Sequence, residues 1–174
     1  MRHRRGVGTC TIEEAYEKWS DDLVRYATAL VGPDDAADLV ADAFAVLLAR
    51  GGSAWDEVRD PRGYVFRSVT NAARMHGRSR SRRRGRETTW SVTWSPRPVP
   101  PDDGAEPGMR AELLGDPVVT RALGRLSVRQ RAVVFLTYWE DLDATEVGSR
   151  LGISEGSVKR HLARGRSTLR EVLT

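Results

Sequence analysis

Basic side chains recur at helical spacing near the C-terminal end of the chain. Arg160 and Arg164 fall on one side of a helix at 100° per residue, with Lys159 on the flank. A guanidinium on an exposed helix can pair in bidentate fashion with guanine in the major groove of duplex DNA. The predicted apolar side carries Val158, Leu162, Gly165, Leu169 and Val172. The residues predicted to contact duplex DNA are Ser154, Ser157, Lys159, Arg160 and Arg164.

A tight turn precedes this basic helix. Val147 and Leu151 lie four residues apart on an earlier helix, and Gly152 stands where a left-handed residue most easily ends one. Ser154 is a good N-cap for the basic helix, although Ser157 stands where a capping box would have Glu. The pattern predicts a helix-turn-helix. The alternative for this segment alone is a solvated helix in a small bundle.

A second basic strip lies on a helix predicted to begin at Asp60-Pro61. Its residues lie about 180° from the apolar residues Val65 and Val69. In the loop before it, Trp55 could stack on an unpaired base or close the loop as a buried anchor. The strip comprises Arg67, Asn71, Arg74 and Arg78. It continues into the basic run 78–86, which could be a disordered tail, a phosphate-binding extension, or both.

An acidic side is predicted on the helix that follows Gly32-Pro33, for which Asp34 or Asp35 is the expected N-cap. Asp35, Asp38 and Asp42 line this side, and no His, Ser or Cys stands near them as a catalytic partner. The carboxylates therefore form either a solvated surface or a docking surface for a basic partner. The residues assigned to the packed side of this helix include Leu47 and Leu48.

Charge is strongly segregated along the 174 residues, although the net charge is only +4. The balances of segments 1–60, 61–86, 87–117 and 118–174 are −5, +9, −4 and +4. Two basic blocks separated by an acidic spacer indicate two contacts with a polyanion, and the acidic first block indicates a different protein partner.

Several classes of function are disfavoured by the composition. Cys10 is the sole cysteine, so no disulfide within the chain is expected. His3, His76 and His161 have no neighbours at metal-ligand spacing, and His76 is expected to be a packed residue. We therefore expect no metal and no cofactor. No long apolar run predicts membrane insertion, and a cytoplasmic location is expected.

The elements that position these side chains are all predicted to be helices. Thr11 and Glu14 form a capping box before an amphipathic helix, and Asp116-Pro117 and Ser127 begin further helices, the last within a segment ending at Leu142. The fold class predicted is all-α, with two small helical domains joined by an irregular Pro-rich linker. The expected boundaries are 1–11 for a tail, 12–86 for the first domain, 87–115 for the linker and 116–174 for the second domain.

This order of parts resembles the extracytoplasmic-function class of bacterial RNA polymerase sigma factors. The matching strings are DDAADLVADAF (Asp34–Phe44), DPRGYVFRSVTNAAR (Asp60–Arg74), LSVRQRAVVFLTYWEDL (Leu126–Leu142) and TEVGSRLGISEGSVKRHLARGRSTLR (Thr145–Arg170). The resemblance implies sigma region 2 within 12–86 and sigma region 4 within 116–174. It implies an alternative sigma factor that binds core RNA polymerase, reads the −10 and −35 promoter elements and helps to melt the −10 region.

The resemblance also implies roles for individual residues. Docking on the clamp of the polymerase β′ subunit falls to Asp35, Asp38 and Asp42, and region 4 packs on the β flap. Reading of the −10 element falls to Trp55, Tyr64, Arg67, Asn71, Arg74 and Arg78. Reading of the −35 element falls to Ser154, Ser157, Lys159, Arg160 and Arg164. An anti-sigma partner is left open, and no residue is catalytic, because bond formation belongs to the polymerase.

Two other functions remain as alternatives. The segment SVKRHLARGRSTL also looks like the DNA-binding half of a response regulator, which would make the chain a stand-alone transcriptional regulator. A receiver domain would alternate strands with helices, whereas residues 12–86 read as all helix. An RNA-binding adaptor using the run 78–86 would bind weakly and with uniform salt sensitivity.

Overall fold

The computed structural model describes residues 10–50, 55–84 and 116–173, with the side chains of 78–84 and of a few further residues left out of the description. The chain forms α1 (Ile12–Val31), α2 (Pro33–Arg50), α4 (Pro61–Arg84), α6 (Pro117–Gly124), α7 (Val128–Tyr138), α8 (Ala144–Leu151) and α9 (Glu155–Leu173). Within these ranges every regular element is a helix, which confirms the predicted all-α class. The predicted tail up to residue 9 and the linker 87–115 lie outside the described residues.

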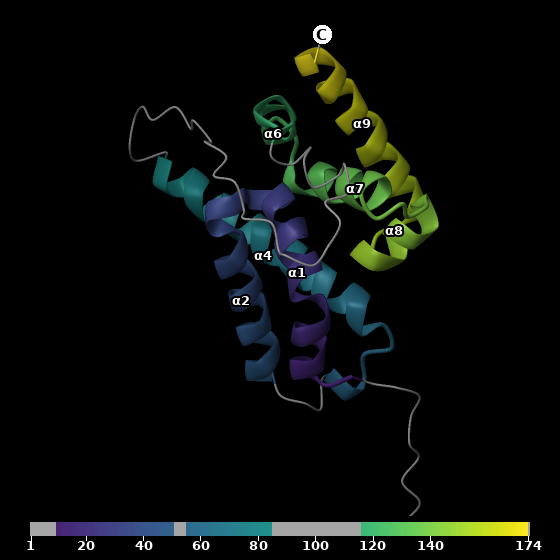
Figure 1. The fold of residues 1–174 in the computed structure, drawn as a ribbon. Coiled ribbons are helices and arrows are strands. Elements are labelled where there is room, and N and C mark those ends of the chain that lie inside the picture. Colours follow the sequence, from purple (N-terminus) through teal and green to yellow (C-terminus); the bar gives the residue numbers. More distant parts are fainter. Residues whose placement is uncertain (1–9, 51–54, 85–115, 174) are drawn as a thin grey trace, which may run out of the picture.

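Helices α1, α2 and α4 pack on one another as the first half of the structure (Figure 1). The predicted capping box begins α1: the Thr11 amide donates to Glu14 Oε2 at 2.8 Å, and the Glu14 amide donates to Thr11 Oγ1 at 3.1 Å. Gly32, at φ 98°, separates α1 from α2, which already begins at Pro33. The prediction that Asp34 or Asp35 is the N-cap is therefore wrong. Both carboxylates lie in the first turn of α2, where the positive end of the helix dipole stabilises their negative charge.

Helices α6 to α9 form the second half. The predicted caps are confirmed, because the Asp116 side chain accepts from the Val118 amide at 2.7 Å and Ser127 forms a capping box with Gln130. Helix α7 ends at Tyr138, before the end of the segment that the sequence favoured. Asp143 caps α8 through a second capping box with Glu146, so a short irregular connection separates the two helices.

The two halves lie against each other. Helix α1 packs on α7, and α4 packs on both α7 and α8 (Figure 1). A single apolar cluster runs through both halves and includes Tyr26 and Phe66 from the first and Phe135, Leu136 and Val147 from the second. The orientation of the basic side chains of α4 and α9 is therefore fixed by the packing of the whole described chain.

Candidate nucleic-acid interface

Helix α9 presents its basic side to solvent. Lys159, Arg160 and Arg164 are exposed, whereas Val158 is fully buried against the second half of the structure. Gly165 is buried too, and a Cβ built on it would lie 3.3 Å from Val134 Cγ2 on α7. The predicted close approach of a neighbouring helix at Gly165 is thus confirmed. Because α7 packs on the side of α9 that carries Gly165, the exposed Lys159, Arg160 and Arg164 remain accessible to a ligand.

The turn before α9 brings two helices into close contact. Gly152 ends α8 with φ 66°, the left-handed conformation that glycine favours. The Ile153 amide donates to the Gly148 carbonyl at 2.9 Å, and a Cβ built on Gly148 would lie only 2.8 Å from the Ile153 carbonyl oxygen. Ser154 caps α9, since its Oγ accepts from the Ser157 amide at 3.3 Å. Both glycines are therefore required by the predicted helix-turn-helix.

The first turn of α9 carries an ion pair that the sequence analysis missed. Lys159 Nζ lies 2.5 Å from Glu155 Oε1, and Thr145 Oγ1 donates to Glu155 Oε2 at 3.3 Å. The hydrogen bond from Lys159 lowers the pKa of Glu155, and the same bond raises the pKa of Lys159. The i, i+4 spacing was the available signal. The Lys159 ammonium group therefore already has a partner, Glu155, on the same helix.

A histidine lies among the arginines of this helix. Partial burial lowers the pKa of His161, and the positive charges of Arg129, Arg164 and Arg160 lower it further. His161 therefore favours its neutral form beside the basic side of α9. The positive charge of this surface comes mainly from guanidinium groups, which keep their charge at any physiological pH.

The basic strip of α4 is partly covered by α8. Arg67 Nη1 donates to the Ser149 carbonyl at 3.1 Å, and its guanidinium lies 6.0 Å from the centre of the Tyr64 ring. Asn71 is exposed and Arg74 is half-buried. Arg78 lies within α4, but its side chain is outside the described residues. All four residues of the predicted strip therefore lie on one helix, and Arg67 already has a partner in the other half of the chain.

Trp55 is a buried anchor of the loop, which is one of the two roles that the sequence allowed; the other was stacking on an unpaired base. The indole is 5% exposed, and its Nε1 donates to the Cys10 carbonyl at 2.6 Å. Its ring meets Tyr64 edge-on with centroids 6.0 Å apart. In this conformation Trp55 anchors the entry to α4 and positions Tyr64, while its own faces are covered.

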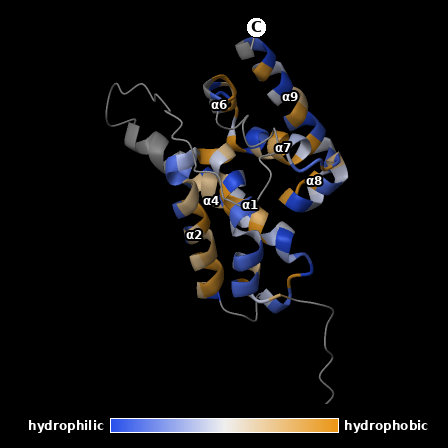
Figure 2. Cartoon of the chain, viewed as in Figure 1, coloured by the Kyte–Doolittle hydropathy of each residue, from blue (hydrophilic) through white to orange (hydrophobic). Residues whose placement is uncertain are grey.

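The acidic side of α2 differs from the prediction in two places. Asp38 and Asp42 are exposed as expected, whereas Asp35 is half-buried with Oδ2 3.3 Å from Nε2 of the half-buried His76 on α4. Leu48, assigned to the packed side, is 52% exposed, and Val46 is 51% exposed. Figure 2 shows the hydrophobic colour that runs along α2. The accessible surface of α2 therefore combines carboxylates with apolar side chains.

Comparison with known proteins identifies the family. The family model of sigma-70 region 2 matches residues 15–83, and the family model of sigma-70 region 4 matches residues 118–169. The RNA polymerase sigma-E factor of Streptomyces coelicolor is 34% identical over 165 residues, which cover 92% of this chain and 85% of the relative. The chain belongs to the sigma-70 family. It is an extracytoplasmic-function type alternative sigma factor, which directs RNA polymerase to promoters at the start of transcription.

Other relatives agree with this assignment. The sigma-E factor of Streptomyces avermitilis is 33% identical over 166 residues, covering 92% of this chain and 84% of the relative. Among solved structures, the sigma factor RpoE in complex with the anti-sigma factor NepR from Bartonella quintana has a TM-score of 0.66 at 20% identity and covers 92% of this chain and 95% of that one. CnrH in complex with the cytosolic domain of CnrY has a TM-score of 0.55 at 20% identity, covering 93% and 86%. These two structures support the fold.

Two features are absent from the residues that the structure describes. None of the helices in the ranges described is both long and apolar enough to cross a membrane. Within the same ranges, no group of three or more His, Cys, Asp or Glu side chains is placed to hold a metal ion.

Proposed function

We propose that α9 of this sigma factor reads the −35 element as duplex DNA and that the basic strip of α4 reads the −10 element. The observation that carries the proposal is the placement of Arg160 and Arg164, exposed on α9 opposite the buried Val158 and Gly165. An exposed helix that follows a helix-turn-helix turn can enter the major groove with its first turns nearest the base edges. The candidate residues are Ser154, Ser157, Lys159, Arg160 and Arg164 for −35, and Trp55, Tyr64, Arg67, Asn71, Arg74 and Arg78 for −10.

In α4 the proposal gives Tyr64 and Arg67 the leading parts. Tyr64 is half-buried beside the Trp55 anchor, and the Arg67 guanidinium lies over its ring. An aromatic side chain next to a basic helix is suited to hold an unstacked base, which promoter melting requires. The buried Trp55 packs against the Tyr64 ring and holds it in position, so its effect on −10 reading is indirect.

Docking on the polymerase is assigned to the outer surface of α2. Asp38 and Asp42 supply negative charge beside the exposed Val46 and Leu48. Such a surface is complementary in charge and in hydrophobicity to a partner that carries basic and apolar residues. We propose that this partner is the clamp of the β′ subunit. Asp35 contributes less, because its carboxylate faces His76. We propose domain boundaries at 12–86 and 116–174 with 87–115 as the linker, and contact of region 4 with the β flap.

The remaining assignments follow from this role. Bond formation belongs to the core polymerase, so the sigma factor has no catalytic residue of its own and requires no cofactor. It acts in the cytoplasm, where the polymerase and its promoters are. The solved RpoE structure named above contains the anti-sigma factor NepR, and we propose that an anti-sigma factor controls this chain as well.

Abortive transcription tests the proposal. The purified chain is added to bacterial core polymerase with a pool of genomic promoter fragments, and new starts are mapped. We expect starts that depend on the chain and share a −10 and a −35 sequence. A chain that binds core polymerase without producing any specific start would contradict the assignment of the two promoter elements.

Two double variants test the docking surface. Asp38→Arg with Asp42→Arg should weaken association with core polymerase in a pull-down, because it reverses the charge of the α2 surface. Glu17→Arg with Asp21→Arg makes the same charge change at the same spacing on exposed positions of α1. Equal binding by the two double variants would contradict docking through α2.

A further inference from the structure

An ion pair occupies the N-terminal end of α9. Glu155 is the first residue of the helix, and its Oε1 lies 2.5 Å from Lys159 Nζ, one turn further on. Thr145 Oγ1 of α8 donates to Glu155 Oε2 at 3.3 Å. Each carboxylate oxygen therefore has a partner, one on each helix of the helix-turn-helix. A side chain that is held from two elements keeps a defined orientation, which a recognition group requires.

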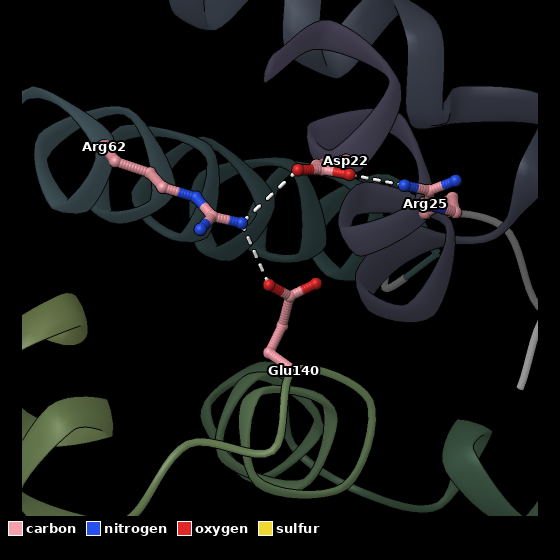
Figure 3. Close-up of polar contacts among 4 residues, drawn as sticks. All are labelled: Asp22, Arg25, Arg62 and Glu140. Carbon is pink, nitrogen blue, oxygen red and sulfur yellow. Dashed lines mark hydrogen bonds and ion pairs between the residues drawn. The ribbon is translucent and has the colours of Figure 1, made fainter. Parts of the chain in front are cut away.

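The ion pairs of Arg62 provide a contrast. Arg62 Nη2 lies 3.0 Å from Glu140 Oε2 and 3.3 Å from Asp22 Oδ2, so one guanidinium joins α4 to α1 and to the residues after α7 (Figure 3). The side chains of Arg62, Asp22 and Glu140 are 36%, 28% and 21% exposed. Those of Glu155 and Lys159 are 48% and 67% exposed. The pair on α9 therefore leaves more of its surface open to a further partner.

The residues around Glu155 are small. Ser154 and Ser157 cap the helix and lie 2.9 Å apart at their hydroxyl oxygens, and a Cβ built on Gly156 would meet nothing within 4 Å. Glu155 and Lys159 are therefore the long polar side chains at this end of α9. When such a helix enters the major groove, its first turns lie nearest the base edges.

The pair has hydrogen-bonding capacity to spare. An ammonium group has three donors, of which one faces Glu155, and each carboxylate oxygen has a second lone pair. The bond between the two groups lowers the pKa of Glu155 and raises that of Lys159, so both are charged at neutral pH. A negative acceptor and a positive donor are thus presented side by side.

A C·G base pair offers the complementary groups in the major groove. Cytosine presents its N4 donor to a carboxylate, and guanine presents its O6 and N7 acceptors to a lysine. Because N4 and O6 are hydrogen-bonded to each other, they lie about 3 Å apart, close to the spacing of the ion pair. We infer that Glu155 and Lys159 together read one C·G base pair of the −35 element, with Glu155 on cytosine N4 and Lys159 on guanine. This assignment rests on the proposed function of α9.

The carboxylate makes this contact selective. On a surface that binds a polyanion, a carboxylate weakens binding to every sequence that does not offer it a donor. Guanine and thymine place an acceptor opposite Glu155, so they should be rejected most strongly. Adenine offers its N6 donor, but thymine O4 is then the acceptor left for Lys159, and the thymine methyl group lies beside it. The expected order under Glu155 is therefore cytosine, then adenine, then guanine and thymine.

Base preference at the −35 element tests this inference. The full chain with core polymerase initiates on a promoter library in which the −10 element is fixed and each −35 position is varied, and starts are counted for each template. For the wild type we expect one position that favours C over G or T by about five- to 150-fold. Glu155→Gln should reduce this ratio at least about fivefold. Starts from the G and T templates should increase, because the amide carries no charge and can donate.

Lys159→Met removes the donors and keeps the length of the side chain. It should reduce the preference at the same position, because guanine loses its partner. Since both side chains read one base pair, the double variant should lose no more selectivity than the stronger single variant, whereas independent effects would multiply. Glu171→Gln is the matched control, with the same charge change on an exposed carboxylate near the other end of α9 that accepts from Ser167 at 3.4 Å. It should leave every base preference unchanged.

The outcomes separate this inference from the proposed function. Unchanged base preferences in Glu155→Gln, or an equal change on all −35 templates, overturn reading by the pair. Changes at different positions for Glu155→Gln and Lys159→Met overturn it as well. In each of these cases the proposed function of α9 stands if the wild type distinguishes −35 templates. A wild type that starts equally from all −35 templates overturns the proposed function, and with it this inference.

Discussion

Helices α4 and α9 carry similar basic strips in different surroundings. Each places arginines opposite an apolar side, Arg67 in the first and Arg160 and Arg164 in the second. On α9 these arginines are exposed, whereas on α4 Arg67 is held by the Ser149 carbonyl of α8. The comparison shows that a helical pattern determines which side of a helix is basic. Whether that side is accessible depends on a distant part of the chain.

The largest expected effect comes from the buried aromatic ring of Phe66 on α4, close to where α4 meets the second half of the chain. Phe66→Ala removes a fully buried ring that contacts Tyr26, Arg62 and Arg150. Truncation of a buried Phe typically costs about 3–5 kcal/mol, and we expect a loss in this range for the free energy of unfolding in urea. Met75→Ala is the control on the same helix, since Met75 is 70% exposed. Similar losses for the two variants would show that Phe66 does not pack as described.

The next effect concerns the turn that positions α9. In Gly148→Ala the new Cβ would lie 2.8 Å from the Ile153 carbonyl oxygen, so backbone would have to move. We expect a loss of about 1–3 kcal/mol in the free energy of unfolding, together with weaker duplex binding. Gly156→Ala is the matched control, because a Cβ there meets nothing within 4 Å. That substitution should be neutral or stabilising, by up to about 1 kcal/mol, through helix propensity. If Gly148→Ala is as stable as Gly156→Ala, α8 and α9 do not cross as closely as described.

A smaller and more specific effect is expected on the surface of α9 that we propose reads the −35 element. Arg160→Ala and Arg164→Ala should each reduce discrimination at one position of the −35 element by about 1–3 kcal/mol, the range for a lost bidentate contact. Footprints on promoters with intact and mutated −35 sites measure this difference. Arg166→Ala is the control, because the Arg166 guanidinium donates to the Tyr138 hydroxyl at 2.7 Å and stacks on that ring. Equal weakening on intact and mutated sites would mean that the two arginines contact only phosphate.

Much of the fold was predictable because its determinants are local. The caps at Thr11, Asp116 and Ser127 depend on residues two or three positions apart, and Gly152 ends α8 through its own backbone conformation. The exposed basic side of α9 was predictable for the same reason, since it follows from a 3.6-residue period.

The covered strip of α4 could not be predicted in this way. Arg67 and Ser149 are 82 positions apart, and no local pattern brings them together. Leu48 is the opposite case: its apolar side chain indicated burial, but the fold leaves it exposed. Trp55 had two possible positions, and the Cys10 carbonyl that fixes one of them lies 45 residues away.

The smallest predicted effect isolates the hydroxyl at the centre of the contact between the halves. Burial raises the pKa of Tyr26 well above its ordinary value near 10, although the hydrogen bond with Thr70 opposes the shift. The folded state therefore holds this proton more tightly than the unfolded state does. Tyr26 contributes full stability below about pH 10, and that contribution is lost as the pH rises through the raised pKa.

Tyr26→Phe removes both the hydrogen bond and the titration. At neutral pH we expect a loss of about 0.5–1.5 kcal/mol in the free energy of unfolding, the usual contribution of one hydrogen bond. Above about pH 10 the free energy should fall less steeply for the variant than for the wild type. Tyr16, Tyr64 and Tyr138 are present in both proteins, so their contributions cancel in the difference. Parallel pH profiles would show that the Tyr26 hydroxyl reaches water, and hence that the two halves of the chain do not stay closed around it.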